Sequence, residues 1–199
     1  DCGNTLTFDH IINVDDTQAP VLTGAPTDIT VEGCDASSAT VPAAETTVAG
    51  LESLAGITSI DDNCTTDANL TVSHSDATAG TCPLVITRTY EIEDECGNML
   101  TFTQTINVDD NTDPVIASAI ADQPANQMGS CVYEVPDVTG LVSATDNCTA
   151  VGSLTITQSP VAGTVIAANT ALTITVADEC GNTATTPVNI IVPASVTAS

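Results

Sequence analysis

The chain has 199 residues, eight cysteines, 2% aromatic side chains and a formal charge of −25, with 26 acidic residues against one basic residue. This charge excludes a nucleic-acid binder of the usual kind, because nothing neutralises phosphates, and it argues against docking on anionic lipid. No apolar run reaches about 18 residues, so no direct membrane insertion is expected.

The chain opens on DCGN, a truncated copy of the DECGN found at 94–98 and 178–182. Residues 1–16 therefore match the C-terminal strand of a preceding repeat. We expect the chain to be a fragment of a longer protein whose export signal lies elsewhere. The strand in TLTFDHIINV is expected either to be disordered or to complete the sheet of a neighbouring chain, as donor strands do.

Landmarks recur in the same order along the chain. INVDDTQAPVL at 12–22 returns as INVDDNTDPVI at 106–116, an offset of 94. DDNC at 61–64 returns as TDNC at 145–148, and DECGN at 94–98 returns at 178–182, both at an offset of 84. A period of this length indicates a string of domains. We predict two complete repeats, at residues 17–110 and 111–199.

Within each repeat the signals are those of strands. Val, Ile, Leu and Thr alternate with period two, and Gly, Asp, Asn and Pro fill the gaps. Residues 43–56 alone have a doubtful helical pattern. The sequence therefore predicts an all-β fold of tandem immunoglobulin-like β-sandwich domains. The expected strands are 70–75, 84–93, 99–108, 153–159, 171–177 and 186–192.

The sole basic residue, Arg88, lies in the predicted strand 84–93. We expect it to pair with a carboxylate such as Glu91 or Glu93, or to lie on the solvent face.

Successive strands run in opposite directions, so alternate loops lie at the same end of a domain, and this places the cysteine-bearing loops. DDNC and DECGN return to the end at which the chain enters a domain, so their cysteines share a loop layer close enough for a disulfide. Sequence alone does not fix the connectivity, and the alternatives are reduced thiols or a zinc site, for which the CxxC pairs are missing. The predicted disulfides are Cys64–Cys96, Cys148–Cys180 and Cys34–Cys82, with Cys2 and Cys131 left over.

Acidic residues recur in register beside the two linkers, VDDTQAP at 14–20 and VDDNTDP at 108–114. Carboxylates gathered there are costly unless a cation lies among them, and Ca²⁺ takes about six to eight hard oxygens in flexible geometry. Asn63, Asn98, Asn111, Asn147 and Asn182 are further oxygen sources. The alternative is that these residues are turn formers on a solvated surface. The predicted Ca²⁺ ligands are Asp15, Asp16, Asp61, Asp62, Asp94 and Glu95 at one junction, and Asp109, Asp110, Asp113, Asp146, Asp178 and Glu179 at the next.

The run VDDNTDPVI, then TDNC, then LTITVADECGNTATTPVNIIV resembles the HYR-type immunoglobulin-like repeats of giant secreted adhesins of Bacteroidetes, including the gliding-motility adhesin. The resemblance covers both repeats and the leading segment. It implies an extracellular stalk or adhesive filament at the cell surface, whose partners are neighbouring repeats of the same long chain. The linkers also resemble the acidic junctions of cadherins, where calcium stiffens the joint. The second repeat departs from the first in lacking a counterpart of Cys82.

Three kinds of function are weighed. The first is a structural spacer whose joints are stiffened by Ca²⁺ and whose loops are stapled by disulfides. The second is an adhesive module that binds a protein or glycan, which the four aromatic residues of the chain disfavour, or a fibre-forming subunit that exchanges strands. The third is an enzyme, and we expect none, because acids in a repeated register serve structure and no nucleophile motif is present.

Overall fold

A computed structural model describes residues 2–38 and 40–193. Residues 1, 39 and 194–199 lie outside it, and with them the outermost positions of the predicted repeats. The chain divides into two compact units, each described separately below. The first comprises residues 1–29, 42–78 and 86–106, and the second comprises residues 30–41, 79–85 and 107–199. The predicted repeat boundaries follow sequence periodicity instead of spatial proximity, and they stay a prediction.

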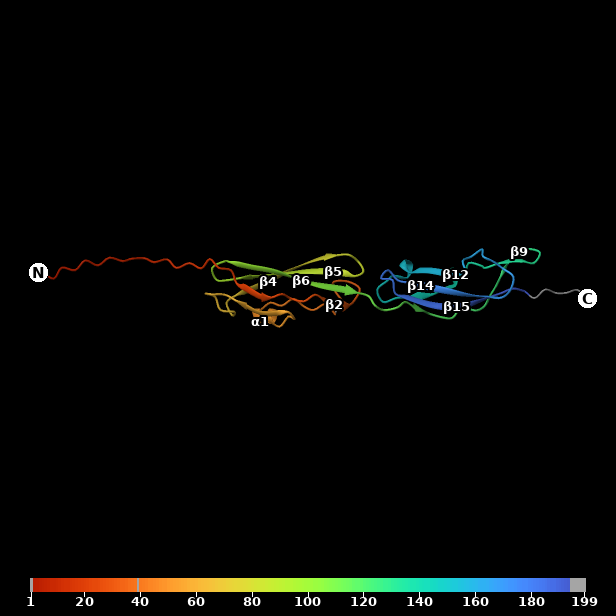
Figure 1. The fold of residues 1–199 in the computed structure, drawn as a ribbon, viewed down its shortest axis with the longest axis horizontal. Helices are drawn as coiled ribbons and strands as arrows, with labels where there is room; N and C mark the ends of the chain where they lie inside the picture. The colour runs from red at the N-terminus through yellow and green to blue at the C-terminus, as the bar shows by residue number, and fades with distance from the viewer. Residues whose placement is uncertain (1, 39, 194–199) are drawn as a thin grey trace, which may run out of the picture. The chain divides into compact units, whose positions relative to one another are not determined.

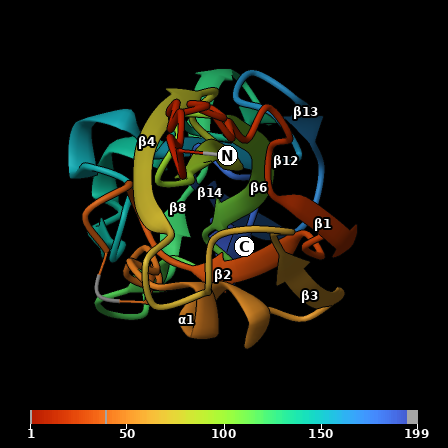
Figure 2. The ribbon, with the colours of Figure 1, turned by 90° about the vertical axis from the view of Figure 1, so that its left-hand side faces the viewer.

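Long strands with alternating burial dominate the first unit. In β5, Ile86, Arg88, Tyr90 and Ile92 are buried, while the residues between them are more exposed. One sheet has four strands in the order β2-β6-β5-β4, of which residues 30–32, 79, 84–85 and 107–109 are counted with the second unit. A second, two-stranded sheet pairs β1 with β3 in antiparallel fashion, and the two strands lie side by side in Figure 2. The bounds are β1 (Val21–Gly24), β2 (Ile29–Glu32), β3 (Ile57–Asp61), β4 (Thr71–Ala79), β5 (Leu84–Glu93) and β6 (Met99–Asp109).

A single turn of helix, α1 (Val48–Glu52), occupies the segment with the doubtful helical pattern. Thr47 caps it, because its side chain accepts a hydrogen bond from the backbone N–H of Gly50 at 3.1 Å. Val48 and Leu51 are buried in the apolar core of the first unit, together with Tyr90. The helix thus closes a core that is built almost wholly from aliphatic side chains.

The second unit contains three sheets. The largest has the order β12-β14-β15-β8, and its first three strands lie side by side in Figure 1. Leu172, Ile174 and Val176 alternate along β14 and are fully buried against Val188 and Ile190 of β15. The strands are β7 (Val115–Ile116), β8 (Gln123–Pro124), β9 (Asn126–Gly129), β10 (Val132–Glu134), β11 (Ala144–Thr145), β12 (Thr155–Ser159), β13 (Val165–Ile166), β14 (Thr170–Ala177) and β15 (Thr183–Ile191), with 3₁₀ turns at Thr139–Leu141 and Val151–Ser153.

The predicted fold class, tandem immunoglobulin-like β-sandwich domains, is confirmed. Each of the six long predicted strands overlaps an observed one, from β4 to β6 and in β12, β14 and β15. Residues 2–16 form no strand, and Leu6, Phe8, Ile11, Ile12 and Val14 in this segment are exposed. Within the described residues, no helix is long and apolar enough to cross a membrane.

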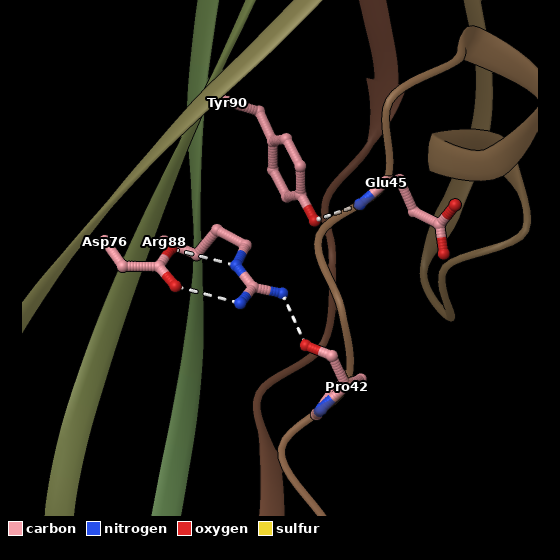
Figure 3. A network of polar contacts seen from close by, with 5 residues as sticks. All are labelled: Pro42, Glu45, Asp76, Arg88 and Tyr90. Atoms are coloured by element: carbon pink, nitrogen blue, oxygen red, sulfur yellow. Dashed lines mark hydrogen bonds and ion pairs between the residues drawn. The ribbon is translucent and has the colours of Figure 1, made fainter. Parts of the chain in front are cut away.

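Arg88 is buried and forms an ion pair with Asp76 (Figure 3). It pairs with neither Glu91 nor Glu93. Its guanidinium donates two hydrogen bonds of 2.9 Å to the two oxygens of the Asp76 carboxylate. A third donor reaches the backbone oxygen of Pro42, also at 2.9 Å. Arg88 is buried because it lies on the same face of β5 as the buried Ile86 and Tyr90. The neighbouring strand β4 supplies its counter-charge.

Candidate metal centres

Three aspartates from separate segments gather in the first unit. Asp16 precedes β1, Asp62 follows β3, and Asp94 follows β5. One carboxylate oxygen of each lies within 4.8 Å of the others. These residues, Asp16, Asp62 and Asp94, are called the first triad below. The predicted convergence of the two loops with the linker is therefore present at these three positions.

Asp110, Asp146 and Asp178 form a second triad in the second unit, within the same 4.8 Å limit. Asp146 and Asp178 follow Asp62 and Asp94 by 84 residues each, so the sequence repeat is also a repeat of local structure. Two members are deeply buried, since Asp110 is 3% exposed and Asp178 is 7% exposed.

One loop aspartate of each triad fixes its own turn. Asp62 accepts hydrogen bonds through Oδ1 from the backbone N–H groups of Cys64 (2.9 Å) and Thr65 (2.6 Å). Asp146 accepts from the N–H groups of Cys148 and Thr149 at the same two distances. The turn-forming interpretation is therefore correct for Oδ1, but it leaves Oδ2 unexplained.

An asparagine joins the linker to the DECGN loop. Asp94 Oδ1 accepts from the N–H groups of Cys96 and Asn98, both at 2.8 Å. The Asn98 side-chain amide donates to Asp94 Oδ2 at 2.7 Å and to the backbone oxygen of Asp16 at 3.1 Å. Asn98 thus contributes its NH₂ group to the cluster. In the second unit, Asn182 makes the same contacts with Asp178 and Asp110.

Four carboxylate oxygens of the triads are buried and accept no hydrogen bond from the described residues. They are Oδ2 of Asp16 and Asp62 in the first triad and Oδ2 of Asp110 and Asp146 in the second. An unpartnered buried polar atom costs about 1–3 kcal/mol, and more when it is charged. A divalent cation satisfies several such oxygens at once, so the donor set fits an ion of this kind.

The acidity of the triad members reflects their surroundings. Burial raises the pKa of Asp110, and the carboxylates of Asp146 and Asp178 raise it further. The side-chain hydrogen bond from Asn98 lowers the pKa of Asp94. A cation beside Asp110 would offset this cost of its charged form.

Six predicted ligands lie outside the triads. Asp15 and Asp61 are exposed. Asp113 accepts a hydrogen bond from the backbone N–H of Thr183 at 3.2 Å. Asp109 lies near the sulfurs of Cys82 and Cys180, which are bonded to each other and offer no thiolate. A ligand role for these residues stays a prediction; the six are Asp15, Asp61, Glu95, Asp109, Asp113 and Glu179.

One buried threonine ties the loops of each triad together. Thr65 is 4% exposed, and its hydroxyl accepts from the backbone N–H of Glu95 at 3.3 Å. Thr149 is 3% exposed and accepts from the N–H of Glu179 at 3.1 Å. We did not predict this role, although a threonine follows DNC in both repeats and was a usable signal.

The predicted disulfide pairs are wrong. Cys34 is bonded to Cys148 with Cα atoms 4.9 Å apart, and Cys82 is bonded to Cys180 at 5.3 Å. All four cysteines line one cavity of about 50 Å³ in the second unit. The loops that carry Cys34 and Cys82 meet the loops that carry Cys148 and Cys180 at this cavity. Each cysteine therefore bonds to a loop of the other pair. Among the described residues, Cys2, Cys64, Cys96 and Cys131 form no disulfide.

The linker of the second triad is also held by Glu32, a residue that the sequence analysis missed. The Glu32 carboxylate accepts from the backbone N–H of Asn111 at 3.1 Å and from the Thr112 hydroxyl at 3.1 Å. In addition, the N–H of Gly33 donates to the backbone oxygen of Asp109 at 3.1 Å. Residues 109–112 are thus fixed from β2, and no sequence pattern marked Glu32 for this role.

Comparison with known proteins identifies fold neighbours only. A scan against protein-family models finds no match, and neither does a search of curated proteins. Drosophila N-cadherin EC1-4 is similar at a TM-score of 0.35 and 12% identity, over 89% of this chain and 50% of that one. The ectodomain of human desmocollin-1 is similar at 0.27 and 11%, over 87% of this chain and 40% of that one. The chain therefore spans half or less of the length of these neighbours, which are cadherin ectodomains.

Proposed function

We propose that the chain is a structural spacer of a large secreted surface adhesin, in which each triad binds Ca²⁺ and disulfides staple the loops. The observation that carries the proposal is the pair of buried, unpartnered carboxylate oxygens in each triad. These oxygens recur at equivalent positions of both units. Their repetition favours a ligand that every repeat of the chain uses.

The chemistry of the triads favours calcium over other ions. All three side chains offer carboxylate oxygens, and no triad contains a histidine or cysteine ligand. Zn²⁺ prefers sulfur and nitrogen, and Mg²⁺ demands near-ideal octahedral geometry with few protein ligands. Asp16, Asp62 and Asp94 would hold one ion, and Asp110, Asp146 and Asp178 would hold another. The ion would supply the positive charge that three converging carboxylates lack.

An ion held by a triad would restrict the linker. Asp16 and Asp110 belong to linker segments, whereas the other members belong to loops that follow strands. Coordination by all three would fix the linker against both loops. A short linker without such ties leaves neighbouring domains free to rotate, so the ties supply the stiffness that a spacer needs.

The two disulfides support an extracellular setting. Disulfides such as Cys34–Cys148 and Cys82–Cys180 persist in oxidising compartments. The resemblance to HYR-type repeats supports the finer proposal of a cell-surface adhesin of Bacteroidetes with a role in gliding motility. Neighbouring repeats of the same chain are then the partners. Catalysis is not proposed, since one oxygen of Asp62 and of Asp146 already fixes a turn.

A second candidate, fibre formation by strand donation, rests on the exposed N-terminal segment. LTFDHIINVDD at 6–16 closely matches LTFTQTINVDD at 100–110. In β6 the aligned residues Ile106 and Val108 are fully buried, whereas Ile12 is 76% exposed and Val14 is 92% exposed. The segment thus has the apolar face of a central strand without a sheet. Light scattering that shows both the full chain and a chain lacking residues 1–16 to be monomers would exclude this candidate.

Calorimetric titration of the oxidised chain with CaCl₂ tests the main proposal. The expected result is saturable binding of two ions per chain, one for each triad, and weaker binding of Mg²⁺ under the same conditions. Calcium would be refuted as the ligand if the titration gave no binding heat at several temperatures and Ca²⁺ did not change the free energy of unfolding.

A further inference from the structure

We infer that the face of the first unit that carries Cys64 and Cys96 is a socket for two cysteine-bearing loops of another repeat, to which it becomes joined by two disulfides. The inference goes beyond the proposed calcium-binding spacer, since it concerns covalent coupling and needs no metal. It rests on a comparison of this face with its counterpart in the second unit.

The two faces present their cysteines in the same way. Cys64 and Cys148 occupy equivalent positions, and the backbone N–H of each donates to the preceding aspartate at 2.9 Å. The neighbouring asparagine amide reaches the sulfur at 3.1 Å in both cases. Cys96 and Cys180 are likewise equivalent, and both N–H groups donate to an aspartate at 2.8 Å.

Their bonding differs, and the difference defines the socket. In the second unit, Cys148 is bonded to Cys34 and Cys180 to Cys82, so Cys148 and Cys180 do not bond each other. The loops that carry Cys34 and Cys82 cover them. Cys64 and Cys96 have the same backbone geometry but no bonded partner among the described residues. By analogy with Cys148 and Cys180, we expect Cys64 and Cys96 to bond cysteines of other loops and not each other.

The surface around Cys64 is open where its counterpart is closed. Residues 61–68 line a hollow of about 430 Å³ in the first unit. In the second unit, Cys148 and Thr149 line a cavity of only about 50 Å³, which is shared with the loops around Cys34 and Cys82. The larger hollow is where the corresponding pair of loops would lie.

The occupant is a repeat that resembles residues 17–110, because it must carry cysteines at the positions of both Cys34 and Cys82. The second repeat does not qualify. Cys131 lies at the turn of the β9–β10 hairpin with a φ of 62°, and not directly after the strand that corresponds to β2. The segment that corresponds to Cys82 contains Val165 and Ile166 instead. A second copy of this chain docked through its last repeat is therefore not the occupant.

The coupling chemistry is a thiol oxidation by a disulfide reagent. A socket thiol and a loop thiol together lose two protons and two electrons and form one S–S bond. A small-molecule disulfide, such as oxidised glutathione, accepts them and is reduced to two thiols. Two such reactions complete the junction.

A tandem duplication within the full chain tests the inference. The variant carries residues 1–110 followed by residues 17–199, and its new joint is native in sequence, because 12–16 and 106–110 are both INVDD. The exposed substitutions Ala36→Ser and Ala79→Ser mark peptides of the first copy by mass. The chain is oxidised with a glutathione redox buffer that contains chelator. Disulfide mapping is expected to find first-copy Cys34 bonded to second-copy Cys64, and first-copy Cys82 bonded to second-copy Cys96.

Thiol counting provides the matched control. The duplication adds four cysteines, yet the count of free thiols is expected to stay at the four of the parent chain. Replacing first-copy Cys34 and Cys82 by serine is expected to raise it by two. Second-copy Cys64 and Cys96 that remain alkylatable, or that bond each other, would overturn the inference. Because chelator is present throughout, neither result bears on the calcium proposal.

Discussion

Cys34 is bonded to Cys148, which lies 114 residues further along the chain. A bridge that closes so long a loop constrains the unfolded chain strongly. The double variant Cys34→Ser/Cys148→Ser is therefore expected to lose about 2–4 kcal/mol of unfolding free energy, measured by denaturant titration of the oxidised protein. The variant Cys131→Ser is the control, and its stability should stay within about 0.5 kcal/mol of the wild type. Equal stability of the double variant and the control would contradict a structural role for this bridge.

The Arg88–Asp76 pair makes a second prediction. Arg88 is 4% exposed, so Asp76→Asn leaves a buried guanidinium without its counter-charge. We expect a loss of about 1–3 kcal/mol in unfolding free energy at pH 7. Glu91→Gln, at an exposed position of the same strand, is the matched control and should have little effect. If both variants are equally stable, the pair does not stabilise the fold.

The same pair gives a pH dependence. The hydrogen bond from Arg88 lowers the pKa of Asp76 in the folded protein. A carboxyl group with a lowered folded pKa stabilises the protein above its unfolded value of about 3.9, and this stabilisation is lost as the pH falls through the folded pKa. The stability difference between wild type and Asp76→Asn should therefore be full at pH 7 and shrink below about pH 4. A difference that is constant from pH 7 to pH 3 would rule out this linkage.

Asp146→Asn separates the turn-forming role from the metal role. Asparagine keeps an oxygen for the N–H groups of Cys148 and Thr149 but removes one negative charge from the second triad. In chelator the variant should be as stable as the wild type or more so, because repulsion falls. In Ca²⁺ it should gain less thermal stability than the wild type. Asp28→Asn, an exposed acid outside both triads, should behave as the wild type in both conditions. A loss of stability in chelator equal to that in Ca²⁺ would reduce Asp146 to a turn former.

The long strands and the triads could be predicted because their signals are local and repeated. Alternation marked β5, β6 and β14, and the register of DDNC and DECGN brought Asp62 and Asp94 to the linker. The shortest strands, such as β7 and β8, have two residues each and carry no periodicity to detect.

The disulfide pairing was missed for a different reason. Sequence parity assigns each cysteine to a loop layer, but it does not reveal that Cys34, Cys82, Cys148 and Cys180 line one cavity. Once four cysteines lie together, the choice of partner depends on distances of a few ångströms. Likewise, the pairing of Arg88 with Asp76 of β4 depends on strand order, so the expectation of a partner within its own strand or of a solvent-facing position was wrong.

The central claim, that the triads bind Ca²⁺, is tested most directly by the thermal unfolding of oxidised wild-type protein in Ca²⁺ and in chelator. An ion that binds only the folded state adds about 2.7 kcal/mol at a concentration of 100 times its Kd. At about 2–4 °C per kcal/mol, the midpoint should rise by several degrees when Ca²⁺ is present. Superimposable unfolding curves at millimolar Ca²⁺ and in excess chelator would contradict the claim and leave the converging aspartates without an ion.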